Sequence, residues 1–268
     1  MRAIALVAGA VFRESVRDRV PYSMVVFAVL LMAASYLISQ LTAGQDLKII
    51  KDLGLAAIAI FGLLIAVFIG IGLVSKEVER KSVYGLLTKP VTRSQFIVGK
   101  YAGLVLTLAV NITAMTVAFY AVLYYMDAVA SESARAVWPA PPADPWLLVA
   151  IGLIFAELMV VTAVALFFST FSSPLLATML TLGLWIAGHF NADLRNFENV
   201  VDAPAVVWIA RTLYYVLPNL APFDVRAEVV HGFPVAMRHV GLTLVYAAVY
   251  GGMLLVAAVA IFRRRDFK

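Results

Sequence analysis

The sequence predicts an all-α integral membrane protein with six transmembrane helices. Hydrophobic residues make up 63% of the 268 residues and charged residues only 14%, whereas soluble domains are about 45–50% apolar and about 25% charged. The mean hydropathy is +0.94, and apolar runs of roughly 20 residues, enough to cross a bilayer as a helix, recur along the chain. A membrane β-barrel is excluded because the runs are too long and lack two-residue alternation.

The chain contains no cysteine. This absence excludes a disulfide framework, a thiolate metal site and a cysteine nucleophile. At roughly 20 residues for each crossing, the chain has room for about six spans and for no large soluble domain. We therefore expect residues 1–268 to form a single transmembrane domain.

The first 20 residues predict an amphipathic helix that lies on the membrane surface. Ile4, Val7 and Val11 fall on one helical face, and four arginines lie among residues 1–20. These arginines suit the anionic lipids of the cytoplasmic leaflet. A cytoplasmic extension of the first span, interrupted only by Pro21, is the alternative interpretation.

Six apolar runs predict the six spans. They cover residues 22–41, 53–74, 101–126, 146–171, 174–190 and 240–262. The fifth run is the shortest and contains two glycines, so a tilted or broken helix is expected there. With both termini in the cytoplasm, the cytoplasmic segments carry about 14 of the 21 lysine and arginine residues, as the positive-inside rule requires. We therefore expect both termini inside.

The cytoplasmic loop between the second and third spans, residues 75–100, is the most informative segment. Its charged opening and an apolar ridge that includes Leu86 predict a short coupling helix with one face made for a protein partner. Pro90 ends this helix. Thr92 and Gln95 have the spacing of a capping box, which predicts a new helix running from Thr92 into the third span. Such a stiff corner can transmit a movement of a cytoplasmic partner to the third span. A solvated loop that only follows the positive-inside rule is the alternative.

The loop also carries a family resemblance. Its motif is an E-x-E opening, paired leucines, then proline, arginine and Gly-Lys, at Glu77, Glu79, Leu86, Leu87, Pro90, Arg93, Gly99 and Lys100. With the amphipathic N-terminal helix, the six spans, a near-uncharged turn at 167–174 and a basic end at 262–267, the whole chain resembles the permeases of type-2 ABC exporters. Lys81 stands where many relatives have glycine.

The resemblance implies a permease of the cytoplasmic (inner) membrane that dimerises, docks one ATPase subunit per protomer and exports a substrate on ATP hydrolysis. The residues expected at the ATPase contact are Glu77, Glu79, Arg80, Lys81, Leu86, Leu87, Pro90 and Arg93. The chain has no G-x-x-x-x-G-K-[S/T] phosphate-binding loop. ATP and Mg are therefore expected on the partner ATPase, and this chain is expected to be non-catalytic and to bind no cofactor.

The other expected partners are a second permease copy, membrane lipids and an envelope protein. The net charge of +5 predicts no nucleic-acid partner, because the basic residues gather on the cytoplasmic side as the topology requires.

Glu157 is the one ionisable residue expected near the middle of a span. A carboxylate there is costly unless it is protonated or paired. It is therefore a candidate for the translocation pathway or for proton transfer, with Asn111 and Thr162 as polar companions. A protonated carboxyl group that only bonds a neighbouring helix is an equally weighted alternative.

The outer segment, residues 191–238, predicts short extracytoplasmic helices between the last two spans. Its apolar middle, residues 206–217, is flanked by prolines and predicts an interfacial helix that acts as an outer gate. The gate candidates are Trp208, Arg211, Tyr214 and Tyr215. An aromatic belt that only anchors the loop is the alternative. The three histidines are expected near this side, but their spacing matches no metal motif, so no metal site is expected.

Two other function classes remain open at this stage. A secondary transporter or channel needs several polar groups or broken helices at the midplane, and only Glu157 fits. A force-transmitting subunit that remodels an envelope partner without transport would carry the same coupling loop. Neither composition nor motifs identify a substrate.

Overall fold

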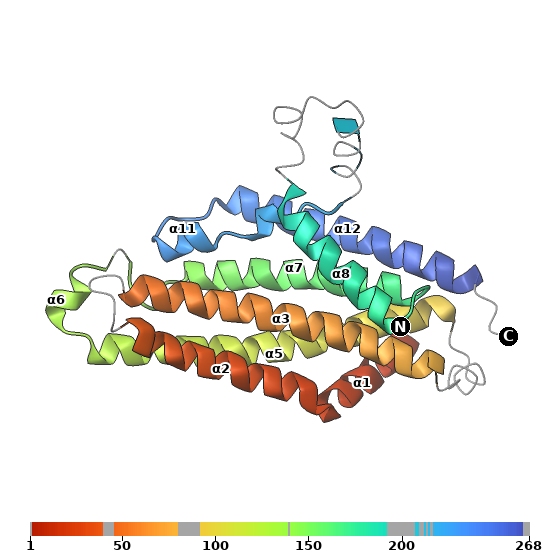
Figure 1. Ribbon diagram of the computed structural model, residues 1–268, viewed down its shortest axis with the longest axis horizontal. Helices are drawn as coiled ribbons and strands as arrows, with labels where there is room; N and C mark the ends of the chain where they lie inside the picture. Colours follow the sequence, from red (N-terminus) through yellow and green to blue (C-terminus); the bar gives the residue numbers. More distant parts are fainter. Residues whose placement is uncertain are drawn as a thin grey trace.

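The computed structural model describes residues 2–39, 46–79, 92–138, 140–191, 207–208, 212, 214 and 217–264. Within these residues all regular structure is helical (Figure 1). The helices are α1 (Arg2–Arg17), α2 (Arg19–Ser39), α3 (Asp46–Glu79), α5 (Arg93–Val129), α6 (Glu132–Arg135), α7 (Trp146–Ser169), α8 (Pro174–His189), η2 (Ala221–Phe223), α11 (Arg226–Val230) and α12 (Met237–Arg264).

Five helices in the described part of the chain are long and apolar enough to cross a membrane. These stretches are Pro21–Ile38, Asp46–Ile71, Arg93–Val129, Trp146–Ser169 and Met237–Arg263. Helix α8 is apolar but has 16 residues, which span about 24 Å against roughly 30 Å of hydrocarbon. The all-helical membrane fold is confirmed, and the sixth crossing stays a prediction.

Two helices extend well beyond the apolar runs that predict them. Helix α3 has 34 residues and α5 has 37, whereas the corresponding runs are residues 53–74 and 101–126. The difference arises because an apolar run marks only the part of a helix inside hydrocarbon. Charged residues that favour helix continue the same backbone hydrogen bonds beyond it.

The spanning helices form one bundle in which α7 is central. Helix α7 packs against α3, α5, α8 and α12, and 16 of its 24 residues are buried. Helices α2, α3 and α5 lie along one side of it and α12 along the other (Figure 1). The start of α1, the end of α12 and the ends of α3 and α5 that flank residues 80–91 lie at one end of the bundle, here called the terminal end. The opposite end is called the α6 end.

Helix α1 packs into a groove that two glycines create on α5. The apolar face of α1 buries Val7 and Val11. A Cβ atom built on Gly99 would lie 2.7 Å from the Val7 Cβ, and one on Gly103 would lie 2.7 Å from the carbonyl oxygen of Ala8. Only glycine allows this approach, because any side chain would overlap α1.

The chain breaks between α1 and α2 at Asp18. Pro21 lies in the first turn of α2, where its missing N–H removes no helical hydrogen bond. The interpretation of residues 1–20 as an extension of the first span interrupted only by Pro21 is therefore wrong. The amphipathic face meets α5 instead.

Candidate functional site

The predicted coupling residues belong to residues 77–93, which include the end of α3 and the start of α5. Glu77 and Glu79 belong to the last turns of α3, and their side chains lie outside the described residues. The predicted contacts Arg80, Lys81, Leu86, Leu87 and Pro90 also lie outside them. Arg93, the first residue of α5, is described.

The start of α5 has the capping box that the sequence predicts. The backbone N–H of Gln95 donates to Thr92 Oγ1 at 3.3 Å, and the backbone N–H of Thr92 donates to Gln95 Oε1 at 3.1 Å. Two N–H groups that the helix leaves without carbonyl partners are thereby satisfied. This reciprocal cap sets the point at which α5 leaves the loop.

Arg93 connects the same corner to the end of α12. Its Nη1 donates to the carbonyl oxygens of Phe262 at 3.3 Å and Arg263 at 2.7 Å. Carbonyls in the last turn of a helix carry partial negative charge, so a guanidinium there is favourable. The Phe96 ring stacks on the Phe262 ring with centroids 5.9 Å apart. The start of α5 and the end of α12 are therefore joined.

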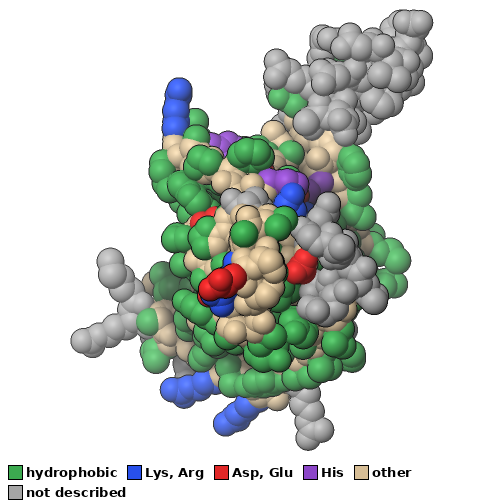
Figure 2. Space-filling view, turned by 90° about the vertical axis from the view of Figure 1, so that its left-hand side faces the viewer, with side chains coloured by type: hydrophobic (Ala, Val, Ile, Leu, Met, Phe, Trp, Pro, Cys, Tyr) green, Lys and Arg blue, Asp and Glu red, His purple; other side chains and the backbone are tan. Residues whose placement is uncertain are grey.

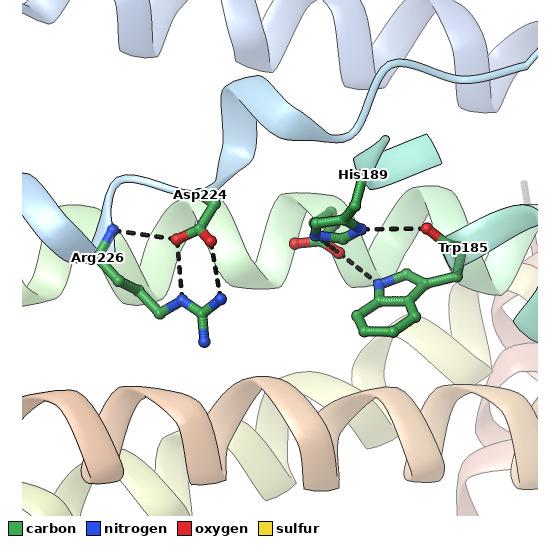
Figure 3. A network of polar contacts seen from close by, with 5 residues as sticks. Trp185, His189, Asp224 and Arg226 are labelled. Carbon is green, nitrogen blue, oxygen red and sulfur yellow. Dashed lines mark hydrogen bonds and ion pairs between the residues drawn. The ribbon is translucent and has the colours of Figure 1, made fainter. Parts of the chain in front are cut away.

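A second polar cluster lies halfway along α7. Glu157 is only 6% exposed. The Trp185 Nε1 donates to Glu157 Oε1 at 2.7 Å, and the His189 Nε2 lies 3.5 Å from the same oxygen (Figure 3). Trp185 and His189 are one helical turn apart on α8. The end of α8 therefore meets the middle of α7.

The hydrogen bond on the other side of the His189 ring defines its tautomer. The Nδ1 lies 3.1 Å from the carbonyl oxygen of Trp185. A carbonyl oxygen can only accept, so Nδ1 carries the proton and donates. The Nε2 then faces the Glu157 carboxyl group, and the contact is favourable only when a further proton lies on one of them. A proton on either group would join Glu157 and His189 as an acid–base pair.

An ion pair from the segment before α12 lies beside this cluster. The Arg226 side chain donates to both carboxylate oxygens of Asp224, at 2.8 Å and 2.7 Å (Figure 3). Hydrogen bonds from the Arg226 side chain hold the pKa of Asp224 below its ordinary value, and the same bonds raise the pKa of Arg226. Both groups therefore remain charged at neutral pH.

Two adjoining cavities contact these residues. The inner cavity, of about 180 Å³, is lined by Glu157, Trp185, His189, Asp224, Arg226 and the apolar Ala59, Ile60, Ile154 and Leu158. The outer cavity, of about 860 Å³, is lined by His189, Asp224, Arg226 and, towards the α6 end, by residues that include Lys48, Asp52, Glu228 and His231. The cavities share His189, Asp224 and Arg226, so the ion pair lies where they meet. Viewed from the α6 end, charged and histidine side chains lie between hydrophobic side chains on either side (Figure 2).

The predicted companions of Glu157 make their hydrogen bonds within their own helices, and a role of Asn111 in the pathway stays a prediction. The Asn111 side chain donates to the carbonyl oxygen of Thr107 and Thr162 to that of Leu158, each four residues back on its own helix. Such local bonds satisfy short polar side chains without a second helix. The observed partners could have been found from the hairpin formed by α7 and α8. The turn of this hairpin is centred between residues 171 and 172. Residue 186 is therefore as far from the turn along α8 as Glu157 is along α7, and Trp185 and His189 lie near residue 186.

Glu157 is also not the only buried ionisable group in the described helices. Lys51 and Lys100 are at most 1% exposed. The Lys51 Nζ donates to the carbonyl oxygen of Pro141 at 2.9 Å, and the Lys100 Nζ lies 5.0 Å from the centre of the Phe96 ring. Sequence reasoning places both outside the spans because apolar runs exclude them.

The predicted outer gate is only partly described. Trp208 is 69% exposed, and the carbonyl oxygen of Tyr214 accepts a hydrogen bond from Asn191 Nδ2 at 3.3 Å. Arg211 and Tyr215 lie outside the described residues. The gate stays a prediction. His231 and His239 bond backbone carbonyl oxygens, and the described residues contain no group of three His, Cys, Asp or Glu side chains suited to a metal.

Comparison with known proteins identifies the family. No curated protein matches the chain significantly. The family model described as ABC-2 family transporter protein matches residues 5–266. This range covers most of α1, every candidate span, the chain between α3 and α5, and the cluster around Glu157. The chain is therefore a membrane protein that belongs to the ABC-2 transporter family.

Proposed function

We propose that this chain is the transmembrane permease subunit of an ATP-driven exporter, in which a separate ATPase subunit supplies the energy. The observation that carries the proposal is the corner between α3 and α5. The two longest described helices end and begin at this corner. Both of these helix ends lie at the terminal end, and the start of α5 carries a capping box and the Arg93 contact with α12. Family membership supports the same assignment.

The contacts at this corner suggest how motion would spread. A push on residues 80–91 would reach α5 at its capped start. Because Arg93 bonds the last carbonyls of α12 and α1 lies against Gly99 and Gly103, these three helices would move together. In this mechanism the ATPase contacts the predicted coupling residues, and closure of two ATPase subunits tilts α5 so that access alternates across the membrane.

The proposed assembly contains two permease copies in the cytoplasmic membrane, with both termini inside. Apolar side chains such as Leu242, Val245, Val249 and Val256 are exposed on α12. In a membrane such a surface faces lipid or another helix. The translocation pathway would lie between the two copies.

Co-purification tests the coupling role. We would express the chain with a candidate ABC ATPase subunit, and compare the parent with a Glu77→Lys, Glu79→Lys double variant and with Glu132→Lys, an exposed charge reversal on α6. We expect the double variant to lose ATPase binding and Glu132→Lys to keep it. Retained binding in the double variant, or ATP hydrolysis by this chain alone, would refute the proposal.

A further inference from the structure

We propose that the inner cavity beside Glu157 is a binding site for a small organic ammonium group, which enters through the outer cavity. The site lies within one protomer and requires no ATPase contact. It can therefore be tested on the chain alone, and its failure would leave the proposed coupling role untouched.

The charge of the inner cavity favours a cation. Its described lining holds two carboxyl groups, those of Glu157 and Asp224. Asp224 is neutralised by two hydrogen bonds from the Arg226 side chain. Among the described residues, the polar groups in direct contact with Glu157 are an indole N–H at 2.7 Å and the His189 Nε2 at 3.5 Å. When His189 is neutral, a cation beside an ionised Glu157 removes an unbalanced buried charge.

The remaining lining suits an alkylated ammonium rather than a hydrated ion. The Trp185 indole lies beside the carboxyl group, and Ala59, Ile60, Ile154 and Leu158 complete the wall. Tryptophan attracts quaternary ammonium groups through its ring face, and apolar walls accept their methyl groups. A volume of about 180 Å³ corresponds to roughly six water volumes, which is close to the size of choline.

Other ligand classes fit these residues less well. The described residues offer no cluster of three metal-ligating side chains, so a bare divalent cation would lack ligands. A small anion would meet the Glu157 carboxylate, and the one Lys or Arg in the described lining of the inner cavity, Arg226, is engaged by Asp224. A neutral alcohol would leave the proton of the Glu157–His189 pair in place and would gain no charge pairing with Glu157.

The acid–base pair gives the site a distinctive pH dependence. The charged groups that face Glu157 are His189 from α8 and Asp224 and Arg226 from the segment before α12, while Asp52 of α3 acts on Arg226. When an ammonium pairs with ionised Glu157, the dissociable proton shared with His189 leaves. Protons and ligand therefore compete, and the affinity rises with pH, by at most about tenfold per pH unit for one released proton.

Equilibrium binding of radiolabelled choline to the purified chain in dodecyl maltoside tests the site. We expect saturable binding that 3,3-dimethyl-1-butanol, the neutral isostere of choline, displaces at least about tenfold less well than unlabelled choline. We also expect tighter binding at pH 8 than at pH 6. Absence of saturable binding, equal competition by the isostere, or binding that weakens as pH rises would overturn the proposal.

Variants locate the binding. Glu157→Gln should weaken binding at least about tenfold, and Ala59→Leu, which fills the inner cavity while keeping every charge, should do the same. Asp127→Asn removes an exposed carboxylate at the far end of α5 and should leave binding unchanged. If Glu157→Gln does not fold, Ala59→Leu and Trp185→Leu decide the question. Unchanged binding in a folded cavity variant would overturn the proposal.

A further arm separates two sources of the same ammonium chemistry. Soluble dihexanoylphosphatidylcholine carries the choline group within a lipid head group. Competition with radiolabelled choline would support the site and assign it to a head group. Choline binding without such competition would support the site and assign it to a free amine.

Discussion

Replacing Gly103 by alanine should loosen α1 from α5. The new Cβ would lie 2.7 Å from the Ala8 carbonyl oxygen and 2.7 Å from the Val11 Cβ, whereas ordinary contacts begin at 3.4 Å. Helix α1 must therefore move away by about 0.7 Å, and the obstacle includes backbone, which cannot rotate aside. Overpacking of this kind costs about 1–3 kcal/mol.

The absence of cysteine from the chain makes this loosening easy to measure. A single Val11→Cys substitution places a thiol at a site that is 4% exposed, so a maleimide should label it only when α1 opens. If Gly103→Ala destabilises the state in which α1 is packed on α5, a loss of about 1–3 kcal/mol should raise the maleimide labelling rate roughly 5- to 150-fold. The reason is that 1.4 kcal/mol is about a factor of ten in an equilibrium constant.

Gly252→Ala is the matched control for this measurement. Gly252 lies in α12, and no neighbouring atom lies within 4 Å of its added Cβ. We expect the labelling rate of Val11→Cys to be unchanged in this background, since alanine in an open helical position is neutral or stabilising. An unchanged rate in the Gly103→Ala background would refute the conclusion that Gly103 holds α1 in place.

Three further predictions concern other contacts. Arg93→Ala should lower the stability of the protein by about 1–2 kcal/mol through loss of its hydrogen bonds to α12. Thermal unfolding of the parent, Arg93→Lys and Arg93→Ala would measure this loss. Equal melting temperatures for all three proteins would contradict the prediction. The lowered pKa of Asp224 contributes stability that is present above its ordinary pKa of about 4 and is lost as pH falls through the lower folded value. The melting temperature of the parent should therefore fall in acid. The part of that fall that comes from protonation of Asp224 should be absent in Arg226→Gln. Lys51→Ala should destabilise the protein more than Lys51→Met does. Both variants lose the hydrogen bond to the Pro141 carbonyl oxygen, but alanine also leaves a cavity. Equal melting temperatures for the two variants would argue against tight packing around Lys51.

Local signals predict the start of α5 well. Thr92, Gln95 and the preceding proline lie within a few residues of one another, and a capping box is satisfied by the backbone it belongs to. Apolar runs likewise locate the candidate spans, because the cost of an unpaired backbone group in hydrocarbon acts on every residue of the segment. They do not mark where helices end, so the buried Lys51 lies outside its predicted span.

The sequence by itself determined that this is an all-helical membrane protein, where its apolar helices lie, and where α5 begins. Only the tertiary structure decided that Glu157 meets Trp185 and His189 on α8, that Arg93 joins α12, and that α1 fits against Gly99 and Gly103. The physical reason is the range of the interactions. Hydropathy and caps act between neighbours in the chain, whereas these contacts depend on how rigid helices cross, and that is decided by packing along their whole length.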